Sequence, residues 1–297
     1  MTLYEAGYGP GGVSFADILE GNVATAADTG LTVPRIAELI TIGGWPGNLG
    51  SDVADGQRLV RAYVDQLANT DVPHLDESIR DPRGRRPDPR AISRLLRSLA
   101  RNVATTASIS TLVTDVNGRD GNLKRETVVG HLDALSRLFI TEDLPAWRPS
   151  LRSRTRLREA EVRHLVDPSL AVAAMRASPE TLLRDVKWLG FLFENLVVRD
   201  LRVYVQAAGA EVSSYRDATG LEVDIVVEHA SIGWAAFEVK LGQGAVDGAA
   251  GSLLALRDRV DTRSIGEPAA LVVVTATGLA YRRDDGVQVV PIGSLMP

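Results

Sequence analysis

The stretch from Leu221 to Lys240 constrains the fold of this chain more than any other stretch. Apolar residues occupy alternate positions in both of its halves, which predicts two β-strands joined by a tight turn at residues 231–233. Successive side chains of a strand point to opposite faces of a sheet. If the two strands pair as a hairpin, Asp224, Glu238 and Lys240 therefore lie close together on one face.

Two carboxylates in an apolar sheet repel each other and lose hydration, and a divalent cation relieves both costs. Mg²⁺ binds carboxylate, carbonyl and water oxygens and commonly meets one or two protein carboxylates. The neighbouring lysine would then place a positive charge beside a phosphate or an attacking water. This face therefore carries the parts needed for metal-assisted phosphodiester hydrolysis. The alternative is a hairpin with one solvated face, on which acidic and basic side chains pair across the strands.

Lysine is rare in this chain, which gives Lys240 added weight. The chain has 33 basic residues, and only Lys124, Lys187 and Lys240 are lysines. Arginine and lysine differ in shape, hydration and acidity. The lysine two residues after Glu238 is therefore a candidate for a specific role.

Composition bounds the class of protein. A length of 297 residues suits two domains or three small ones, and a hydrophobic fraction of 45% suffices for their cores. The chain has no cysteine and four scattered histidines, so neither disulfides nor a zinc site are expected. It has no long apolar run, signal peptide or phosphate-binding P-loop motif, which predicts a cytoplasmic protein that neither spans a membrane nor has an ATP site. The net charge of −5 excludes a globally basic nucleic-acid binder but permits a local basic patch.

Three regions are expected along the chain: a helical region at 1–79, a winged-helix-like domain at 80–150 that opens with a linker rich in Pro and Arg, and an α/β domain at 151–297. In the first region, glycine-rich turns separate helices predicted at 13–19, 34–42 and 51–70.

The second region shows the winged-helix pattern of three helices followed by a hairpin. Helices are predicted at 92–103, from Ser108, and at 124–139, with a strand and turn at 138–147. The third helix of such a unit usually reads DNA, and here it would present Lys124, Arg125 and His131. The alternative is a unit that serves only packing or dimerisation.

Arginines alternate in the segment that follows. In a strand, Arg152, Arg154, Arg156 and Arg158 would share one face. Such a stripe could contact phosphates, or it could be a solvated edge whose charges block aggregation.

The third region predicts a long helix followed by strands and a further helix. The helix is expected at 179–208, strands at 211–216, 270–275 and 287–292, and the second helix at 245–260. Glu194 lies in an apolar segment of the long helix, where a carboxylate needs a partner. That partner could be Arg199, Lys187 or the metal site.

The order helix, three strands, helix, strand resembles the PD-(D/E)xK nuclease superfamily, which has a restriction-endonuclease-like αβββαβ fold. The residues that carry the resemblance are Glu194 on the first core helix, Asp224 on the second strand, and Glu238, Val239 and Lys240 on the third. The resemblance implies that the carboxylates and the Val239 carbonyl bind Mg²⁺ or Mn²⁺ and that the lysine assists attack on the phosphodiester.

A wider resemblance covers most of the chain. GGWPG at 43–47, the winged-helix pattern and LFENLVV at 192–198, together with the hairpin, resemble the C-terminal half of bacterial AAA+ ATPase-like proteins of unknown function. Those proteins end in a nuclease-like domain. Their ATPase module is not found in this sequence, so ATP binding is not implied, although an ATPase partner or a homo-oligomer is.

The expected class is thus α/β, or α+β overall, and the expected activity is that of a Mg²⁺-dependent DNA endonuclease. The rival hypotheses are a non-catalytic module for DNA binding or partner docking and a regulator of the toxin–antitoxin type.

Overall fold

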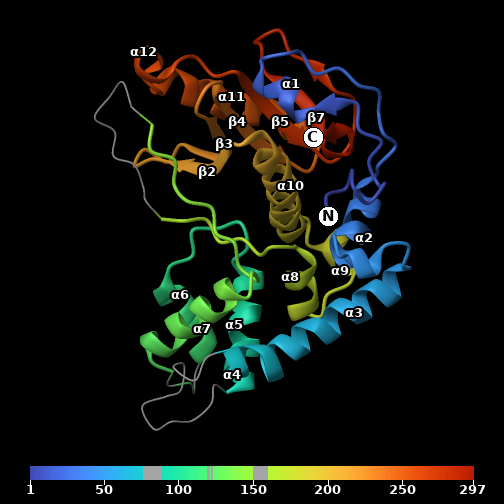
Figure 1. Ribbon diagram of the computed structural model, residues 1–297, viewed down its shortest axis with the longest axis vertical. Coiled ribbons are helices and arrows are strands. Elements are labelled where there is room, and N and C mark those ends of the chain that lie inside the picture. The colour runs from blue at the N-terminus through green and yellow to red at the C-terminus, as the bar shows by residue number, and fades with distance from the viewer. Residues whose placement is uncertain (76–87, 119–120, 122, 150–159) are drawn as a thin grey trace. The chain divides into compact units, whose positions relative to one another are not determined.

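The computed structural model describes residues 1–75, 88–118, 121, 123–149 and 160–297 (Figure 1). These residues form a mixed α/β structure with a six-stranded sheet, which confirms the predicted class. The chain divides into two compact units. The first contains residues 1–36, 144–161 and 196–297, and the second contains residues 37–143 and 162–195.

The first unit is built on the six-stranded sheet, whose strand order is β2-β3-β4-β5-β7-β6. The strands are β2 Glu211–Arg216, β3 Glu222–His229, β4 Gly233–Lys240, β5 Ala270–Thr275, β6 Tyr281–Arg282 and β7 Gln288–Pro291. Strands β2, β3 and β4 pair antiparallel, β4, β5 and β7 pair parallel, and β6 is antiparallel to β7. A separate parallel pair joins β1 Val13–Ser14 to β8 Leu295–Met296.

Helices cover both faces of this sheet, as its composition requires. Every residue of β5 is buried, and a strand buried on both sides needs apolar cover on both. Helix α11 (Val246–Arg259) packs on one face. The apolar core on that side consists of Trp147, Tyr215, Val223, Val226, Trp234, Ala236, Val246, Ala249, Ala250, Leu253, Leu256, Val260, Leu271, Val273, Val287 and Val289.

Aromatic side chains mark the other face. Phe15 of α1 (Phe15–Leu19) lies 5.9 Å from Phe237 of β4 and 6.1 Å from Tyr204 of α10 (Val186–Ala208), measured between ring centroids. Because Trp234 belongs to the α11 side and Phe237 to the opposite side, strand alternation assigns Glu238 to the α11 side.

The predicted order of elements in residues 151–297 is confirmed, with one correction. Strands β2 and β5 have the predicted bounds, and α10, β2, β3, β4, α11 and β5 follow one another in the expected αβββαβ order. The long helix expected at 179–208 is wrong as one helix, because it is interrupted between α9 (Pro179–Arg184) and α10. Asp185 causes the interruption, since its side chain accepts a hydrogen bond from the Trp188 N–H at 3.1 Å and so caps the start of α10.

The second unit is helical. Its elements are α3 Val53–Gln66, the π-helical turn Leu67–Asp71, α4 Val72–Leu75, α5 Pro89–Arg101, α6 Ile109–Asn117, α7 Arg125–Arg137, α8 Ser169–Ala174 and α9, and it includes most of α2 Val33–Ile42. The capping residues explain several starts. The side chains of Asp52, Asp88 and Ser108 each accept a hydrogen bond from the first turn of α3, α5 and α6.

Helices α5, α6 and α7 lie where the three helices of the second region were predicted, but the expected local hairpin after them does not form. After α5, Thr105 pairs with Arg163, and after α7, Thr141 pairs with Leu165. The strand partner therefore comes from residues 162–166, beyond the boundary predicted at 150. The strand and turn expected at 138–147 do not make a local hairpin, because Ala146 pairs with Ser214 of β2 and Trp147 packs 5.0 Å from the ring of Trp234.

The three predicted regions thus differ from the two units of the structure. The segment 144–161 belongs to the first unit, and the winged-helix pattern belongs to the second together with α3 and α8. No helix among the described residues has the length and apolar character needed to cross a membrane.

Candidate functional site

The register of β3 and β4 brings the predicted site residues together. The pairing of the two strands begins at Ile225 and Phe237, directly beside Asp224 on β3 and Glu238 on β4. Lys240 lies two residues beyond Glu238, on the same face. The hydrogen bonds of Lys240 to Asp224 and Glu238 show that the three side chains lie together.

Lys240 contacts both carboxylates. Its Nζ donates to Oδ2 of Asp224 at 3.2 Å and also to Oε2 of Glu238. The Val239 backbone N–H donates to Oδ2 of Asp224 at 2.8 Å, which fixes this carboxylate against the neighbouring strand. The side chain of Glu238 is only 5% exposed, whereas those of Asp224 and Lys240 are 20% and 29% exposed. The site thus has a buried carboxylate behind a more accessible one.

Burial and charge shift the acidity of this site. Burial, reinforced by the negative charge of Asp224, raises the pKa of Glu238 to about 8, although the Lys240 ammonium opposes the shift. Burial alone would lower the pKa of Lys240, but the two carboxylates outweigh it and raise that pKa. Lys240 is therefore a cation at neutral pH, whereas the Glu238 carboxyl keeps its proton up to about pH 8 unless a further positive charge lies nearby.

The oxygen atoms of this site suit a hard divalent cation that takes few of its ligands from the protein. Asp224 and Glu238 supply carboxylate oxygens, and Mg²⁺ commonly takes only one or two such ligands and fills the rest of its shell with water. Among the residues that the structure describes, no group of three or more His, Cys, Asp or Glu side chains is arranged to hold a metal. An ion at this site would therefore rely on two carboxylates, backbone oxygens and water.

Glu194 lies on helix α10 and not on the β3–β4 hairpin. It is partly buried on the part of α10 that belongs to the second unit. Its role as a metal ligand, like that of the Val239 carbonyl, stays a prediction.

The residues predicted to contact nucleic acid differ in their exposure to solvent. Lys124 and Arg125 are exposed at the start of α7. The prediction for His131 is wrong, because its side chain is only 2% exposed and burial lowers its pKa. Spacing explains the burial, since His131 follows Val128 by three positions and precedes Leu135 by four, on the apolar stripe of the helix. Arg152, Arg154, Arg156 and Arg158 lie outside the described residues.

Sequence analysis missed Asp217, which supports the strand that carries Asp224. Its fully buried carboxylate accepts hydrogen bonds from the Tyr215 hydroxyl at 3.1 Å and from the Thr219 N–H and hydroxyl at 2.8 and 2.7 Å. It also accepts from Arg259 of α11. The sequence DATG at 217–220, between two strands, was the available signal, since Asp at the start of a turn bonds the backbone two residues on.

Comparison with protein families places the chain. The model of a family described as "Domain of unknown function (DUF8612)" matches residues 33–181, half of the chain. The chain belongs to the DUF8612 family. A second model, "Domain of unknown function (DUF4143)", matches residues 189–295 of this DUF8612 protein, including Asp224, Glu238 and Lys240. DUF4143 is found in C-terminal regions associated with AAA ATPases, which agrees with that part of the resemblance.

A short gap that contains Asp185 separates the two family matches of the DUF8612 protein. This residue lies in the gap between residue 181 and residue 189, where α9 ends and α10 begins. No curated protein and no solved structure matched the chain.

Proposed function

We propose that this DUF8612 protein is a divalent-metal-dependent nuclease that cleaves phosphodiester bonds in DNA at Asp224, Glu238 and Lys240. The observation that carries the proposal is the sharing of one lysine ammonium by two carboxylates, one of them buried, on adjacent strands of an αβββαβ sheet. Acidic pairs beside a lysine supply both cation ligands and a group that stabilises developing negative charge.

The electrostatics of the site supports binding of a cation. The raised pKa of Glu238 means that the pair tolerates two negative charges poorly, and Lys240 now offsets them. Mg²⁺ or Mn²⁺ would be held by the oxygens of Asp224 and Glu238, with the Val239 carbonyl as a further candidate. When bound, the ion polarises the scissile phosphate and lowers the pKa of water.

The chain's own residues have separate roles in this proposal. The Val239 N–H keeps the Asp224 carboxylate oriented. Lys240, released from one carboxylate, would place its charge beside the phosphate or the attacking water. Exposed Lys124 and Arg125 would contribute phosphate contacts from α7.

A second candidate function is a non-catalytic module for DNA binding or partner docking. It is favoured by the fact that Lys240 already ion-pairs with both carboxylates. In such a module, the three residues would only hold β3 and β4 together.

Calorimetry with MgCl₂ and MnCl₂, together with cleavage assays on single-stranded, duplex and branched DNA, separates these functions. The wild-type protein should bind one divalent ion and cut at least one substrate, and Glu238→Gln should lose both properties. Glu222→Gln is the matched control, because Glu222 is exposed on β3 and pairs with Arg216 outside the site. If the wild-type protein binds no divalent ion and cuts none of the three substrates, the nuclease proposal is rejected in favour of the non-catalytic module.

A further inference from the structure

Phe139 lies in a position that does not suit phenylalanine. It follows α7 with a positive φ of 56°, and its side chain is 79% exposed. The Ile140 N–H bonds to the Leu135 carbonyl at 2.9 Å, which is the pattern of a helix that ends in a left-handed residue. Glycine is preferred there, and Gly209 fills the equivalent place after α10 with a φ of 71°.

Phenylalanine therefore costs stability at this place twice. Left-handed backbone is unfavourable for a residue with a Cβ, and an exposed ring gains nothing from burial. Strained backbone at a residue with a Cβ persists at functional sites, and Phe139 is the most exposed large apolar side chain among the described residues. Phe139 is thus a candidate for contact with another molecule.

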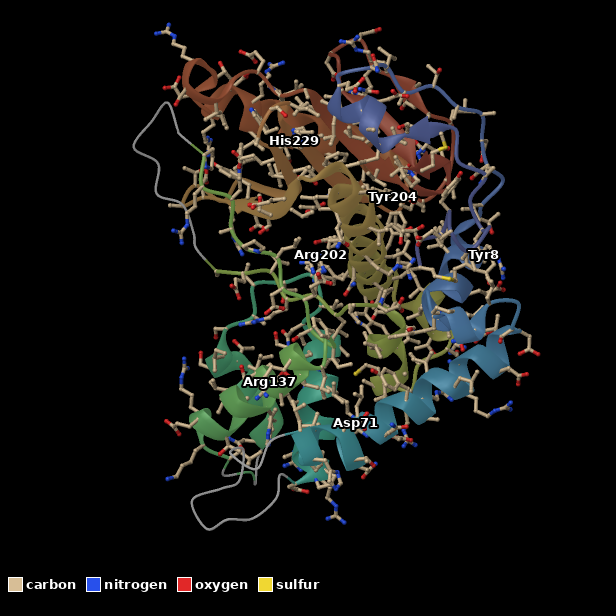
Figure 2. All side chains as sticks on the ribbon, viewed as in Figure 1. Tyr8, Asp71, Arg137, Arg202, Tyr204 and His229 are labelled. Carbon is tan, nitrogen blue, oxygen red and sulfur yellow. The ribbon has the colours of Figure 1, made fainter. Side chains whose placement is uncertain are left out.

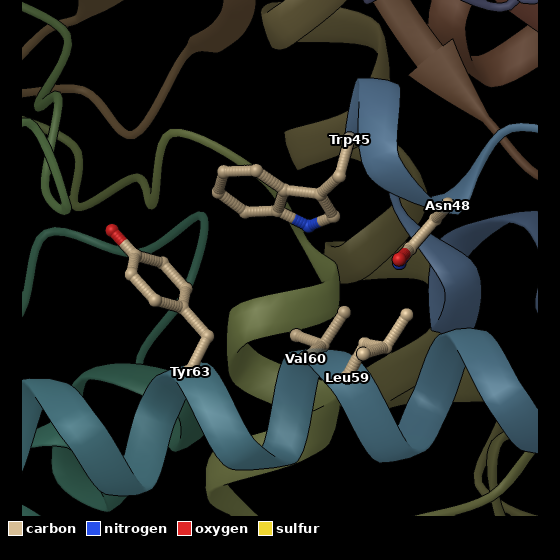
Figure 3. A pocket seen from close by; sticks show the side chains of 5 residues that line it. All are labelled: Trp45, Asn48, Leu59, Val60 and Tyr63. Carbon is tan, nitrogen blue, oxygen red and sulfur yellow. The ribbon is translucent and has the colours of Figure 1, made fainter.

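An apolar pocket lies in the same unit. It has a volume of about 280 Å³ and is lined by Trp45, Asn48, Leu59, Val60 and Tyr63 (Figure 3). The rings of Trp45 and Tyr63 meet edge-on, with centroids 5.5 Å apart. Leu59 contributes an apolar side chain that is half exposed.

The wall of this pocket is held in place by buried polar contacts. The Trp45 indole N–H donates to Oγ of Ser169 at 2.8 Å, and Ser169 in turn donates to Oδ1 of Asp167 at 2.5 Å. Gly43, with a φ of 75°, leaves room for this chain, because a Cβ there would lie 2.4 Å from Oγ of Ser169. Trp45 is therefore fixed in its orientation before anything binds.

Size and chemistry together indicate one aromatic side chain as the occupant. At about 280 Å³, this pocket lies at the small end of the range of about 300–1,000 Å³ that holds cofactors and drug-sized ligands. Its apolar walls and edge-on ring pair offer the tilted contacts that a third aromatic ring prefers.

The charges beside Phe139 and beside the pocket are opposite. Arg137, whose guanidinium also lies 3.9 Å from the Asp133 carboxylate, is two residues before Phe139. In the pocket wall, burial and then the negative charge of Asp71 raise the pKa of Tyr63. Figure 2 labels both, Arg137 on α7 and Asp71 beyond the end of α3. Figure 1 shows α7 and α3 on different sides of the second unit, with α5 between them.

We propose that a second copy of this chain inserts its Phe139 into the pocket formed by Trp45, Leu59 and Tyr63. The contact joins two different surfaces, so each copy can offer Phe139 to one neighbour and its pocket to another. Such head-to-tail contacts build closed rings or open filaments, not two-fold dimers. The Arg137 and Asp71 side chains would pair across the contact.

Mixing two complementary variants tests this proposal. Phe139→Gly keeps the pocket and Leu59→Arg keeps Phe139, so each variant alone should be monomeric by sedimentation velocity, whereas the wild type associates with rising concentration. An equimolar mixture of the two should form dimers and nothing larger, because only one productive contact remains. A monomeric wild type at the highest soluble concentration, or a mixture without dimers, would overturn the proposal.

One control tests for misfolding of the variants, and another tests for nonspecific association through exposed apolar side chains. Phe139→Gly should unfold at or above the wild-type temperature, because glycine suits the left-handed position. Leu279→Ala, which truncates an apolar side chain in the first unit that is 56% exposed, should leave association unchanged. If Leu279→Ala weakens association as much as Phe139→Gly does, the Phe139 contact is rejected.

Charge reversal checks the direction of docking. Arg137→Asp and Asp71→Arg should each weaken association, and one chain that carries both should recover it, since opposite charges then meet again. A double variant weaker than either single variant would contradict the proposed pairing.

Discussion

The Nζ of Lys240 lies 3.2 Å from Oδ2 of Asp224, across the β3–β4 hairpin. The same ammonium also donates to Glu238, so one cation offsets two carboxylates. A divalent ion would compete with this ammonium for the same oxygens, and the lysine variants test that competition.

Lys240→Ala should bind Mg²⁺ or Mn²⁺ at least as tightly as the wild type, because a nearby positive charge is removed. DNA cleavage should fall by about 10²–10³, the cost of losing one charge-stabilising donor. Lys240→Arg should not restore the full rate, because the planar guanidinium places its charge differently. Calorimetry and initial cleavage rates measure the two effects separately. Loss of metal binding in Lys240→Ala would assign the lysine to the structure of the site.

Glu238 should make the folded state less stable as pH rises. Its pKa is raised from 4.5 to about 8, so between these values the folded protein keeps a proton that the unfolded chain loses. Stability from this group is full below about pH 4.5, falls by up to about 1.4 kcal/mol per pH unit and levels off above about pH 8. Glu238→Gln should remove this slope and Glu222→Gln should keep it, as urea unfolding at several pH values would show. Equal slopes in all three proteins would contradict the raised pKa.

Arg259→Ala should destabilise the first unit by about 2–3 kcal/mol, because it leaves the buried Asp217 carboxylate without its cation. The expected loss is below that of a fully buried pair, since 27% of the Arg259 side chain is exposed. Arg257→Ala is the control, because Arg257 pairs with the exposed Asp258 on the same helix and should cost less than about 0.5 kcal/mol. Urea unfolding at pH 7 measures both, and equal losses would remove the special role of Asp217.

Replacing both Lys124 and Arg125 with alanine should weaken binding of duplex DNA by the whole chain. The slope of log K against log salt should become shallower by about 2, since two phosphate contacts are lost. Lys187→Ala, which removes an exposed lysine of α10, should leave the slope unchanged. Fluorescence anisotropy at several salt concentrations provides the slopes. Unchanged slopes in the double variant would make α7 a packing element.

Local sequence pattern determined most of the secondary structure and the central cluster of three residues. Alternating apolar residues are a property of neighbouring positions, so β2 and β5 were predicted with the bounds they have. The short turn between β3 and β4 left little freedom of register, which is why Asp224, Glu238 and Lys240 could be assigned to one face.

Tertiary packing decided what neighbouring positions could not. Residues 162–166, and not the nearby segment at 144–147, complete the β-pairing after α7, while Trp147 packs on Trp234. Phe139 and the Trp45–Tyr63 pocket carry no local signal, since exposure and the closeness of distant side chains depend on which surfaces other elements cover. The sequence by itself therefore determined the elements and the chemistry of the β3–β4 face, while only the folded chain decided which other side chains are buried, paired or left for contact with another molecule.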